Sequence, residues 1–273
     1  AEIECEQVSP LYVAMAQANI NQISNLKPKN RDWREAVWWG GYPEIILKSD
    51  VQFKRIWSEQ YIQTYIDRDI RRLFPDLQIE KYRQFIRMLA FSSGEIINYA
   101  EWSSAIGASE PTIKKYVEIA QGTFLFRKYL AYSFHPTKRL MKSPKGALCD
   151  TGLLTSLLRI DQPDDLFHHH RAGFIFEVFC LEQILKSLKL QMIAFDAYHY
   201  RTKQQQEIDL ILDFSKHKIP VEIKIGTTVR NENLKTISLF IEEEKCPFGI
   251  IINNSEVVCE LAPKIYQIPF GCL

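Results

Sequence analysis

Apolar and charged side chains alternate along residues 207–224, and this is the most informative stretch of the chain. The runs Glu207-Ile-Asp-Leu-Ile-Leu-Asp213 and Ile219-Pro-Val-Glu-Ile-Lys224 predict the two strands of a β-hairpin. Because successive side chains of a strand point to opposite faces, Asp209 shares one face with Glu207 and Ile211, and Glu222 shares one face with Lys224. Burial of an unpaired charge is costly. The pattern therefore predicts either mutual neutralisation of these groups or a bound cation, and both explanations stay open.

The elements around the hairpin follow from the same patterns. Residues 173–189 have apolar side chains at helical spacing, and Glu177 lies on this helix. Residues 193–200 predict a strand, residues 232–244 a second helix and residues 248–253 a final strand. The predicted order over residues 161–273 is therefore αβββαβ.

Residues 1–78 predict a helical N-terminal segment. We expect one helix over residues 11–23, a polar break over 27–31, and a segment from 33 to 43 that begins helical and ends in a turn. Residues 51–73 have apolar positions three and four apart, and Pro75 ends the pattern, which predicts a long amphipathic helix. The charged positions 67–72 near its end are expected to be solvated and ion-paired.

Residues 79–160 have the pattern of a winged helix. Helices are predicted around 82–89, over 99–106 and from Ser109 onward, followed by a strand over 124–130. Ser109 is a natural helix N-cap, and Pro111 is tolerated in the first turn. In a helix-turn-helix the third helix enters the major groove, where Lys114 and Lys115 would contact phosphates. The alternative is a module that joins domains and has a solvated basic face.

Two further groups of charged or titratable residues have competing interpretations. Lys138, Arg139, Lys142 and Lys145 form a basic group that would either grip phosphates or lie in a solvated loop. Three adjacent histidines, at positions 168–170, cannot all face one metal from a regular element. We expect a surface loop there rather than a set of metal ligands.

Composition and charge limit the function classes only weakly. The chain has 273 residues, of which 46% are hydrophobic, so it has enough apolar material for real cores. Its formal net charge is +1, so nucleic-acid contact requires a local basic patch. Six cysteines without a C-x-x-C motif suit reduced thiols. Since no apolar run is long enough to span a bilayer and no signal peptide opens the chain, we expect a cytoplasmic protein without a membrane span.

The order acid, spacer, Glu-x-Lys resembles the PD-(D/E)xK phosphodiesterase superfamily, which includes many restriction-type nucleases. The resemblance implies a restriction-endonuclease-like fold for residues 161–273. It also implies that Asp209 and Glu222 bind Mg²⁺, that Lys224 positions the attacking water or stabilises phosphate, and that Glu177 is an accessory acid. These roles suit the residue types, because hard Mg²⁺ prefers carboxylate oxygens and retains waters.

A second resemblance covers roughly residues 38–253. Its motifs are Gly40-Gly-Tyr-Pro-Glu44, positions 61–70, residues 138–154, Gly173-Phe-Ile-Phe-Glu177, Tyr200-Arg-Thr202, Glu207-Ile-Asp209 and Val221-Glu-Ile-Lys224. In this order they are similar to a group of bacterial and archaeal AAA+-type ATP-binding proteins. In that group a nucleotide-binding domain precedes a domain of unknown function, itself a winged helix plus a restriction-endonuclease-like fold.

The chain departs from that group in one respect: no G-x-x-x-x-G-K-[ST] phosphate-binding loop is present. The sequence is thus expected to be the C-terminal part of such a protein, with residues 1–37 as the tail or lid of a missing ATPase domain. A stand-alone homologue without the ATPase is the other explanation. No ATP site and no ATPase activity are expected from this chain alone.

Together these observations predict a multi-domain α/β protein with a helical N-terminal segment, a winged helix and a nuclease-like αβββαβ domain. The expected function is interaction with nucleic acid, DNA before RNA, with Mg²⁺-dependent phosphodiester hydrolysis. The competing class is non-enzymatic: a catalytically degenerate regulatory or protein-interaction module of the ATPase.

Overall fold

The structure is a computed structural model that describes residues 9–134, 142–202, 204 and 206–273. It divides into two compact units. Unit 1 is built from the described parts of residues 1–33, 129–144 and 179–273, and unit 2 from residues 34–128 and 145–178. Strand β2 (Phe126–Ala131) and helix α13 (Ala172–Leu190) both begin in unit 2 and end in unit 1. Because the structure contains helices and a mixed sheet and divides into two units, it confirms the coarse prediction of a multi-domain α/β protein.

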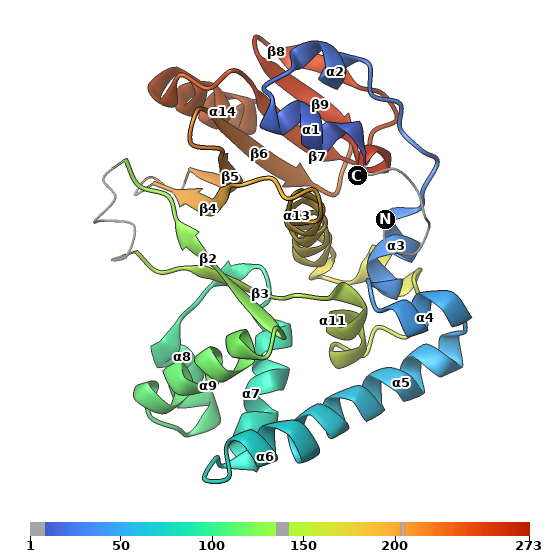
Figure 1. Ribbon diagram of the computed structural model, residues 1–273, viewed down its shortest axis with the longest axis vertical. Coiled ribbons are helices and arrows are strands. Elements are labelled where there is room, and N and C mark those ends of the chain that lie inside the picture. Colours follow the sequence, from blue (N-terminus) through green and yellow to red (C-terminus); the bar gives the residue numbers. More distant parts are fainter. Residues whose placement is uncertain (1–8, 135–141, 203, 205) are drawn as a thin grey trace. The chain divides into compact units, whose positions relative to one another are not determined.

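A mixed β-sheet is the central element of unit 1 (Figure 1). Its strands lie in the order β2-β4-β5-β6-β7-β9-β8. Strands β4, β5 and β6 are antiparallel neighbours, β6, β7 and β9 run parallel, and β8 pairs antiparallel with β9. The bounds are β4 (Asp196–Arg201), β5 (Glu207–Asp213), β6 (Lys218–Lys224), β7 (Gly249–Asn253), β8 (Cys259–Ala262) and β9 (Ile265–Pro269). The predicted hairpin is β5–β6, and the predicted order of elements from α13 to β7 is present.

Helix α14 (Asn231–Glu244) covers one face of this sheet. Its side chains Ile237, Phe240 and Ile241 belong to one buried apolar cluster with Ile211 and Ile251 of the strands. Each such side chain stabilises the fold by roughly 1.5–3 kcal/mol when it is fully buried. This packing fixes the first turn of α14 over the ends of β5 and β6.

Two short helices, α1 (Pro10–Ala16) and α2 (Ile20–Ser24), stand where a single helix over residues 11–23 was expected, so that prediction is wrong. The chain breaks because Ala18 has a positive φ of 52°. Asn19 then caps α2, its Oδ1 accepting a hydrogen bond from the amide of Gln22 at 3.2 Å. Both helices belong to unit 1, where His217 in the β5–β6 turn contacts the carbonyl of Met15 at 2.9 Å.

Unit 2 begins with α3 (Trp33–Trp39) and α4 (Pro43–Lys48), and the predicted helix over 51–73 follows. That helix is continuous but consists of α5 (Val51–Thr64), the π-helical segment η1 (Tyr65–Ile70) and α6 (Arg71–Leu73). The charged positions are ion-paired as expected: Asp67 Oδ1 lies 2.6 Å from an Nη of Arg83. The long helix is therefore confirmed, with a local change of winding that its apolar spacing did not indicate.

Three helices and three strands follow in unit 2. They are α7 (Ile79–Phe91), β1 (Glu95–Ile96), α8 (Tyr99–Ile106), α9 (Glu110–Gly122), the start of β2, and β3 (Lys145–Leu148), which pairs antiparallel with β1. The Ser109 hydroxyl caps α9 by accepting a hydrogen bond from the amide of Thr112 at 3.3 Å. Buried rings of Tyr82, Phe85 and Trp102 hold the helices together. All three helices predicted here are confirmed.

Asp150 joins two turns of unit 2 that lie far apart in the sequence. Its Oδ1 caps α11 (Thr151–Leu157) by accepting from the amide of Leu153 at 2.8 Å, and its Oδ2 accepts from the amide of Gly41 at 2.7 Å. Gly40 has a φ of +72°, and a Cβ there would lie 2.4 Å from the amide nitrogen of Gly152. Only glycine fits so close an approach of two backbones.

A buried lysine packs beside this junction. The ammonium of Lys54, on α5, lies 3.7 Å from the ring centroid of Trp38 and 3.1 Å from Oγ1 of Thr155. The lysine is 1% exposed, and burial lowers its pKa to about 7 despite the opposing charges of Asp150 and Asp161. Its charged form is therefore held at a cost.

Two further findings concern the cysteines and the helices. Within the described residues, the cysteines are free thiols: Cys149, Cys180, Cys246, Cys259 and Cys272. No helix in the described part of the chain combines the length and the apolar content that crossing a bilayer requires.

Candidate functional site

Asp209, Glu222 and Lys224 meet at the ends of β5 and β6, and we call them the acid–lysine cluster. The hairpin register pairs Leu210 with Val221, which makes Asp209 and Glu222 the next positions along each strand. The ammonium of Lys224 lies 2.7 Å from Oε1 of Glu222 and 3.6 Å from Oδ2 of Asp209. The structure thus brings together three of the four predicted catalytic residues.

The backbone at the end of β6 contributes to the cluster. Oδ2 of Asp209 accepts a hydrogen bond from the amide of Ile223 at 2.8 Å, and the ammonium of Lys224 donates to the carbonyl of the same residue at 3.1 Å. The Lys224 nitrogen therefore lies within 3.6 Å of oxygens from two carboxylates and one carbonyl. The cation at this place is the Lys224 ammonium, and its neighbours are hard oxygen donors.

Asn233, in the first turn of α14, was missed by the sequence interpretation. Its Nδ2 donates a hydrogen bond of 2.7 Å to Oε1 of Glu222, the oxygen that also receives Lys224. Asn233 precedes the buried Ile237 by one helical turn, so it lies on the face of α14 that packs against the sheet. A polar residue one helical turn before the apolar positions of this face was the available signal.

The side chains of the acid–lysine cluster differ in how far they are buried. The carboxylate side chains of Asp209 and Glu222 are 5% and 4% exposed, whereas Lys224 is 38% exposed. Hard divalent cations prefer oxygen donors, and Mg²⁺ is commonly held by one or two carboxylates plus waters and substrate phosphates. The cluster fits this donor chemistry. Within the described residues no group of three or more His, Cys, Asp and Glu side chains has metal-binding spacing.

Glu177, the fourth predicted catalytic residue, lies in unit 2. Its Oε1 is 2.8 Å from the ammonium of Lys145, and both side chains are nearly buried, at 11% and 6% exposure. The structure therefore gives Glu177 a basic partner within its own unit. Lys145 belongs to strand β3 and to the core of unit 2, so its placement in a solvated loop is wrong.

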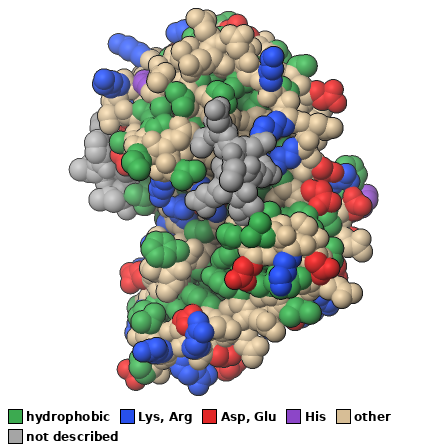
Figure 2. All heavy atoms as spheres, turned by 45° about the vertical axis from the view of Figure 1, so that its right-hand side comes forward, with side chains coloured by type: hydrophobic (Ala, Val, Ile, Leu, Met, Phe, Trp, Pro, Cys, Tyr) green, Lys and Arg blue, Asp and Glu red, His purple; other side chains and the backbone are tan. Residues whose placement is uncertain are grey.

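The structure describes two of the four residues that were predicted to contact nucleic acid. Lys114 and Lys115 are exposed on α9, and the Lys114 ammonium lies 5.5 Å from the ring centroid of Tyr99. Lys138 and Arg139 lie outside the described residues. On the face drawn in Figure 2, basic and acidic side chains are interspersed, in keeping with the net charge of +1.

The three histidines lie on or after the short helix α12 (Asp165–His168). His168 and His170 are exposed, and His169 is half-buried. Burial, and then the neighbouring charges of His170 and Arg171, lower the pKa of His169. The exposure of His168 and His170 agrees with the predicted surface position, although His168 is the last residue of a short helix rather than part of a loop.

Comparisons with known proteins give two matches along the chain and two relatives. Residues 30–164 match the model of a domain of unknown function (DUF8612), and residues 172–273 match that of another (DUF4143). An uncharacterized protein of Mycobacterium tuberculosis (Rv2008c) and one of Mycobacterium bovis (Mb2031c) are each 29% identical over 189 residues. The matched part is 69% of this chain but 42% of each relative, so the chain spans less than half of their length. No solved structure matches the chain.

Proposed function

We propose that unit 1 hydrolyses phosphodiester bonds of nucleic acid, with DNA as the expected substrate, in the manner of the PD-(D/E)xK enzymes. One observation carries the proposal: the Lys224 ammonium sits among oxygens of Asp209, Glu222 and Ile223. Two carboxylates and a lysine at the ends of paired strands are the groups that this chemistry needs. The order of α13, β4, β5, β6, α14 and β7 agrees with the superfamily's αβββαβ core.

Asp209 and Glu222, with the Ile223 carbonyl, are the residues that would hold Mg²⁺. A bound Mg²⁺ lowers the pKa of a coordinated water and offsets charge that develops on phosphate. The chain's own residues supply the rest. Asn233 orients the Glu222 carboxylate, and the Ile223 amide orients that of Asp209. Lys224, whose side chain is 38% exposed, is the residue that would contact the substrate phosphate.

A second candidate function rests on burial. The two carboxylates are almost inaccessible, and Lys224 already neutralises part of their charge. A degenerate nuclease fold, kept as a regulatory or protein-interaction module, would have the same pairing. The two candidates differ in what divalent cations do to the protein.

Unit 2 supports the nucleic-acid part of the proposal. The sequence β1, α8, α9, β2, β3, with β3 paired to β1, has the element order of a winged helix, and α9 presents Lys114 and Lys115 to solvent. The AAA+ resemblance and the greater length of the mycobacterial relatives support a further, ATP-binding domain in the complete protein. Because the chain lacks a phosphate-binding loop, we expect it neither to bind nor to hydrolyse ATP.

The test is nuclease activity with matched variants. Plasmid and single-stranded DNA are incubated with the protein in Mn²⁺ or Mg²⁺, and products are followed on gels. We expect cleavage that Asp209→Ala abolishes and that Lys224→Ala lowers by about a hundredfold or more, the scale for loss of an electrostatic or proton-handling group. Asp196→Ala, which removes an exposed carboxylate from β4, is the control and should leave cleavage unchanged.

A melting experiment separates the two candidates. If the acid pair binds the metal, Mg²⁺ or Mn²⁺ raises the melting temperature of the wild-type protein and not of Asp209→Ala, because a ligand of the folded state stabilises it. Absent cleavage together with an unchanged melting temperature establishes the degenerate site. In that case Lys224→Ala should lower stability, since it leaves buried carboxylates without this cation.

A further inference from the structure

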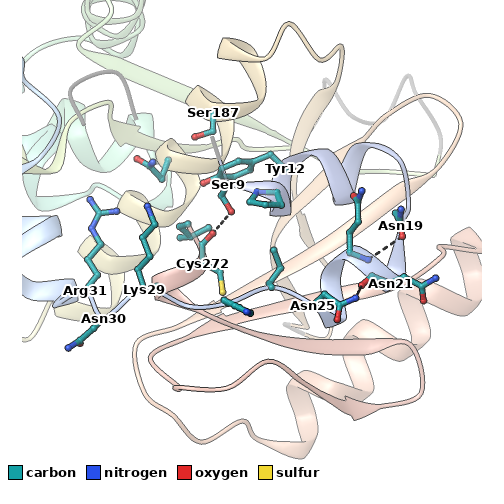
Figure 3. A pocket seen from close by; sticks show the side chains of 17 residues that line it. Ser9, Tyr12, Asn19, Asn21, Asn25, Lys29, Asn30, Arg31, Ser187 and Cys272 are labelled. Carbon is teal, nitrogen blue, oxygen red and sulfur yellow. Dashed lines mark hydrogen bonds between the residues drawn. The ribbon is translucent and has the colours of Figure 1, made fainter. Parts of the chain in front are cut away.

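A cavity of about 850 Å³ lies in unit 1, between helices α1 and α2 and the segment that follows β9 (Figure 3). Its walls come from α1, α2, the segment that follows them, the second half of α13 and the 3₁₀ helix η2 (Phe270–Cys272). The lining contains amides, hydroxyls and basic side chains, and no Asp or Glu is among the described residues that line it. A ligand with negative charge and many hydrogen-bonding groups suits such walls.

Backbone contacts hold the cavity in shape. The amide of Lys29 donates to the carbonyl of Gly271 at 2.9 Å, and the Ser9 hydroxyl donates to the carbonyl of Cys272 at 2.5 Å. A Cβ on Gly271 would lie 2.1 Å from the carbonyl oxygen of Lys29, so only glycine permits this approach. The segment that contains Lys29 is thus attached by specific contacts to the residues that follow the last strand of the sheet.

The basic wall is an alternating run. Residues 26–32 form neither helix nor strand, and Lys27, Lys29 and Arg31 occupy every second position. In Figure 3 the side chains of Lys29 and Arg31 lie next to each other and point the same way, whereas Asn30 points away. In an extended segment, alternate residues share a side and repeat at about 6.6 Å. Lys29 and Arg31 therefore present two cations on the same side, and the Arg31 guanidinium lies 5.8 Å from the ring centroid of Phe270.

The other walls offer hydrogen bonds rather than a reactive group. Tyr12 and Ser187 are buried hydroxyl-bearing residues at the base, and Asn21 and Asn25 on and after α2 are exposed at the rim. Burial raises the pKa of the Cys272 thiol to about 11, so this thiol is protonated at neutral pH and is a poor nucleophile. The cavity is equipped for binding, and the described lining offers no strong nucleophile.

We infer that this cavity binds the sugar-phosphate backbone of single-stranded nucleic acid, with successive phosphates on Lys27, Lys29 and Arg31. The inference deepens the proposed function and rests on it, because it assigns a substrate subsite to the same unit. Strands β6 and β9 run parallel with only β7 between them, so Lys224 and η2 both follow the same edge of the sheet. Ligands of such sheets bind beyond the carboxyl ends of the strands.

The shape of the cavity favours a single strand over a duplex. A cavity with several basic side chains in its lining can receive one extended backbone, whereas a duplex is a convex cylinder that cannot enter. Binding of single strands without base readout depends on a basic groove and on salt. We therefore expect affinity that depends weakly on sequence and strongly on ionic strength.

The experiment measures binding without cleavage. Fluorescent (dT)₁₂, a 12-base-pair duplex and a poly-glutamate peptide are titrated with the full chain in EDTA at several salt concentrations. The variant Lys27→Gln/Lys29→Gln/Arg31→Gln is compared with Lys189→Gln/Lys216→Gln/Lys245→Gln, which removes equal charge from exposed positions of unit 1 outside the cavity. Melting curves confirm that both variants fold.

Loss of the three cavity cations should weaken (dT)₁₂ binding by at least tenfold and lower the slope of log K against log salt by about 2, since each phosphate contact on a single strand contributes about 0.7. The control should change both by much less. Equal effects of the two variants overturn the inference. Binding of the duplex that is as tight as that of (dT)₁₂, or tighter, also overturns it. Equal or tighter binding of poly-glutamate overturns it as well, and identifies an acidic protein segment as the ligand. Cleavage plays no part in this readout, so failure here is distinguishable from failure of the proposed hydrolysis.

Discussion

The ammonium of Lys145 on β3 lies 2.8 Å from the carboxylate of Glu177 on α13, inside unit 2. Two residues that the sequence suggested for different tasks, phosphate contact and catalysis, are thus partners in a nearly buried ion pair. Such a pair offsets the cost of removing both charges from water, and its members depend on each other.

Removing one member of that pair should destabilise the protein. We expect Glu177→Gln to lower the free energy of unfolding by about 3–5 kcal/mol, because it leaves a buried ammonium beside a neutral group. Urea denaturation measures the change. Glu118→Gln, at an exposed position of α9, should stay within about 0.5 kcal/mol. Adding Lys145→Met to Glu177→Gln should restore part of the loss, and a double variant no more stable than the single one contradicts this explanation.

Asn233 should stabilise the acid–lysine cluster. Replacement by Leu keeps the side-chain size but removes the donor to Oε1 of Glu222, and we expect a loss of about 1.5–3 kcal/mol in unfolding free energy, the usual range for a hydrogen bond to a charged group. Asn231→Ala, an exposed change in the same helical turn, is the control for helix propensity. If both variants lose the same amount, the contact with Glu222 has no energetic role.

The exposed lysines of α9 should govern duplex binding if unit 2 contacts DNA. Lys114→Ala/Lys115→Ala is expected to weaken binding of unrelated duplexes alike and to lower the salt slope by about 1–2, because phosphate contacts release counterions. Lys189→Ala/Lys216→Ala removes the same charge from unit 1 as a control. Unchanged affinity and slope in the α9 variant would assign this surface to protein contacts.

Lys54 should make stability depend on pH. Its pKa is about 7 in the folded protein and 10.5 as the ordinary value, so between these values the unfolded chain binds more protons than the folded one. Stability therefore rises with pH across this window, by up to about 1.4 kcal/mol per pH unit. Urea denaturation of the wild type and of Lys54→Met from pH 6 to 9.5 tests this. The difference between the two proteins should shift in favour of the wild type as pH rises, and a constant difference would show that Lys54 is charged throughout.

Local periodicity was sufficient for the helices with a strong apolar face and for the hairpin. The spacing over residues 79–91 and 99–106 depends only on neighbouring turns, and both helices are present. The two-residue alternation likewise placed Glu222 and Lys224 on one face of their strand, whereas the meeting of Asp209 with these two residues depends on the register of the hairpin. Short strands such as β1 and β8 were missed because two to four residues carry too little pattern.

Contacts between distant elements could not be predicted in this way. The partnership of Asn233 with Glu222 needs the docking angle of α14, and that of Lys145 with Glu177 needs β3 and α13 to meet. The break between α1 and α2 was missed because the capping role of Asn19 becomes visible only with the backbone.

The interleaving of the two units has a consequence for synthesis on the ribosome. Unit 2 contains residues 34–128 and 145–178, so its core can close while the chain is still being made. Ser9 and Cys272 of unit 1 share a hydrogen bond across 263 positions. Helices α1 and α2 must therefore wait for their partners until η2 has been translated, and such long-range closure is slow and exposes apolar surface. Helices α1 and α2 are thus the segment for which a chaperone would matter most during translation.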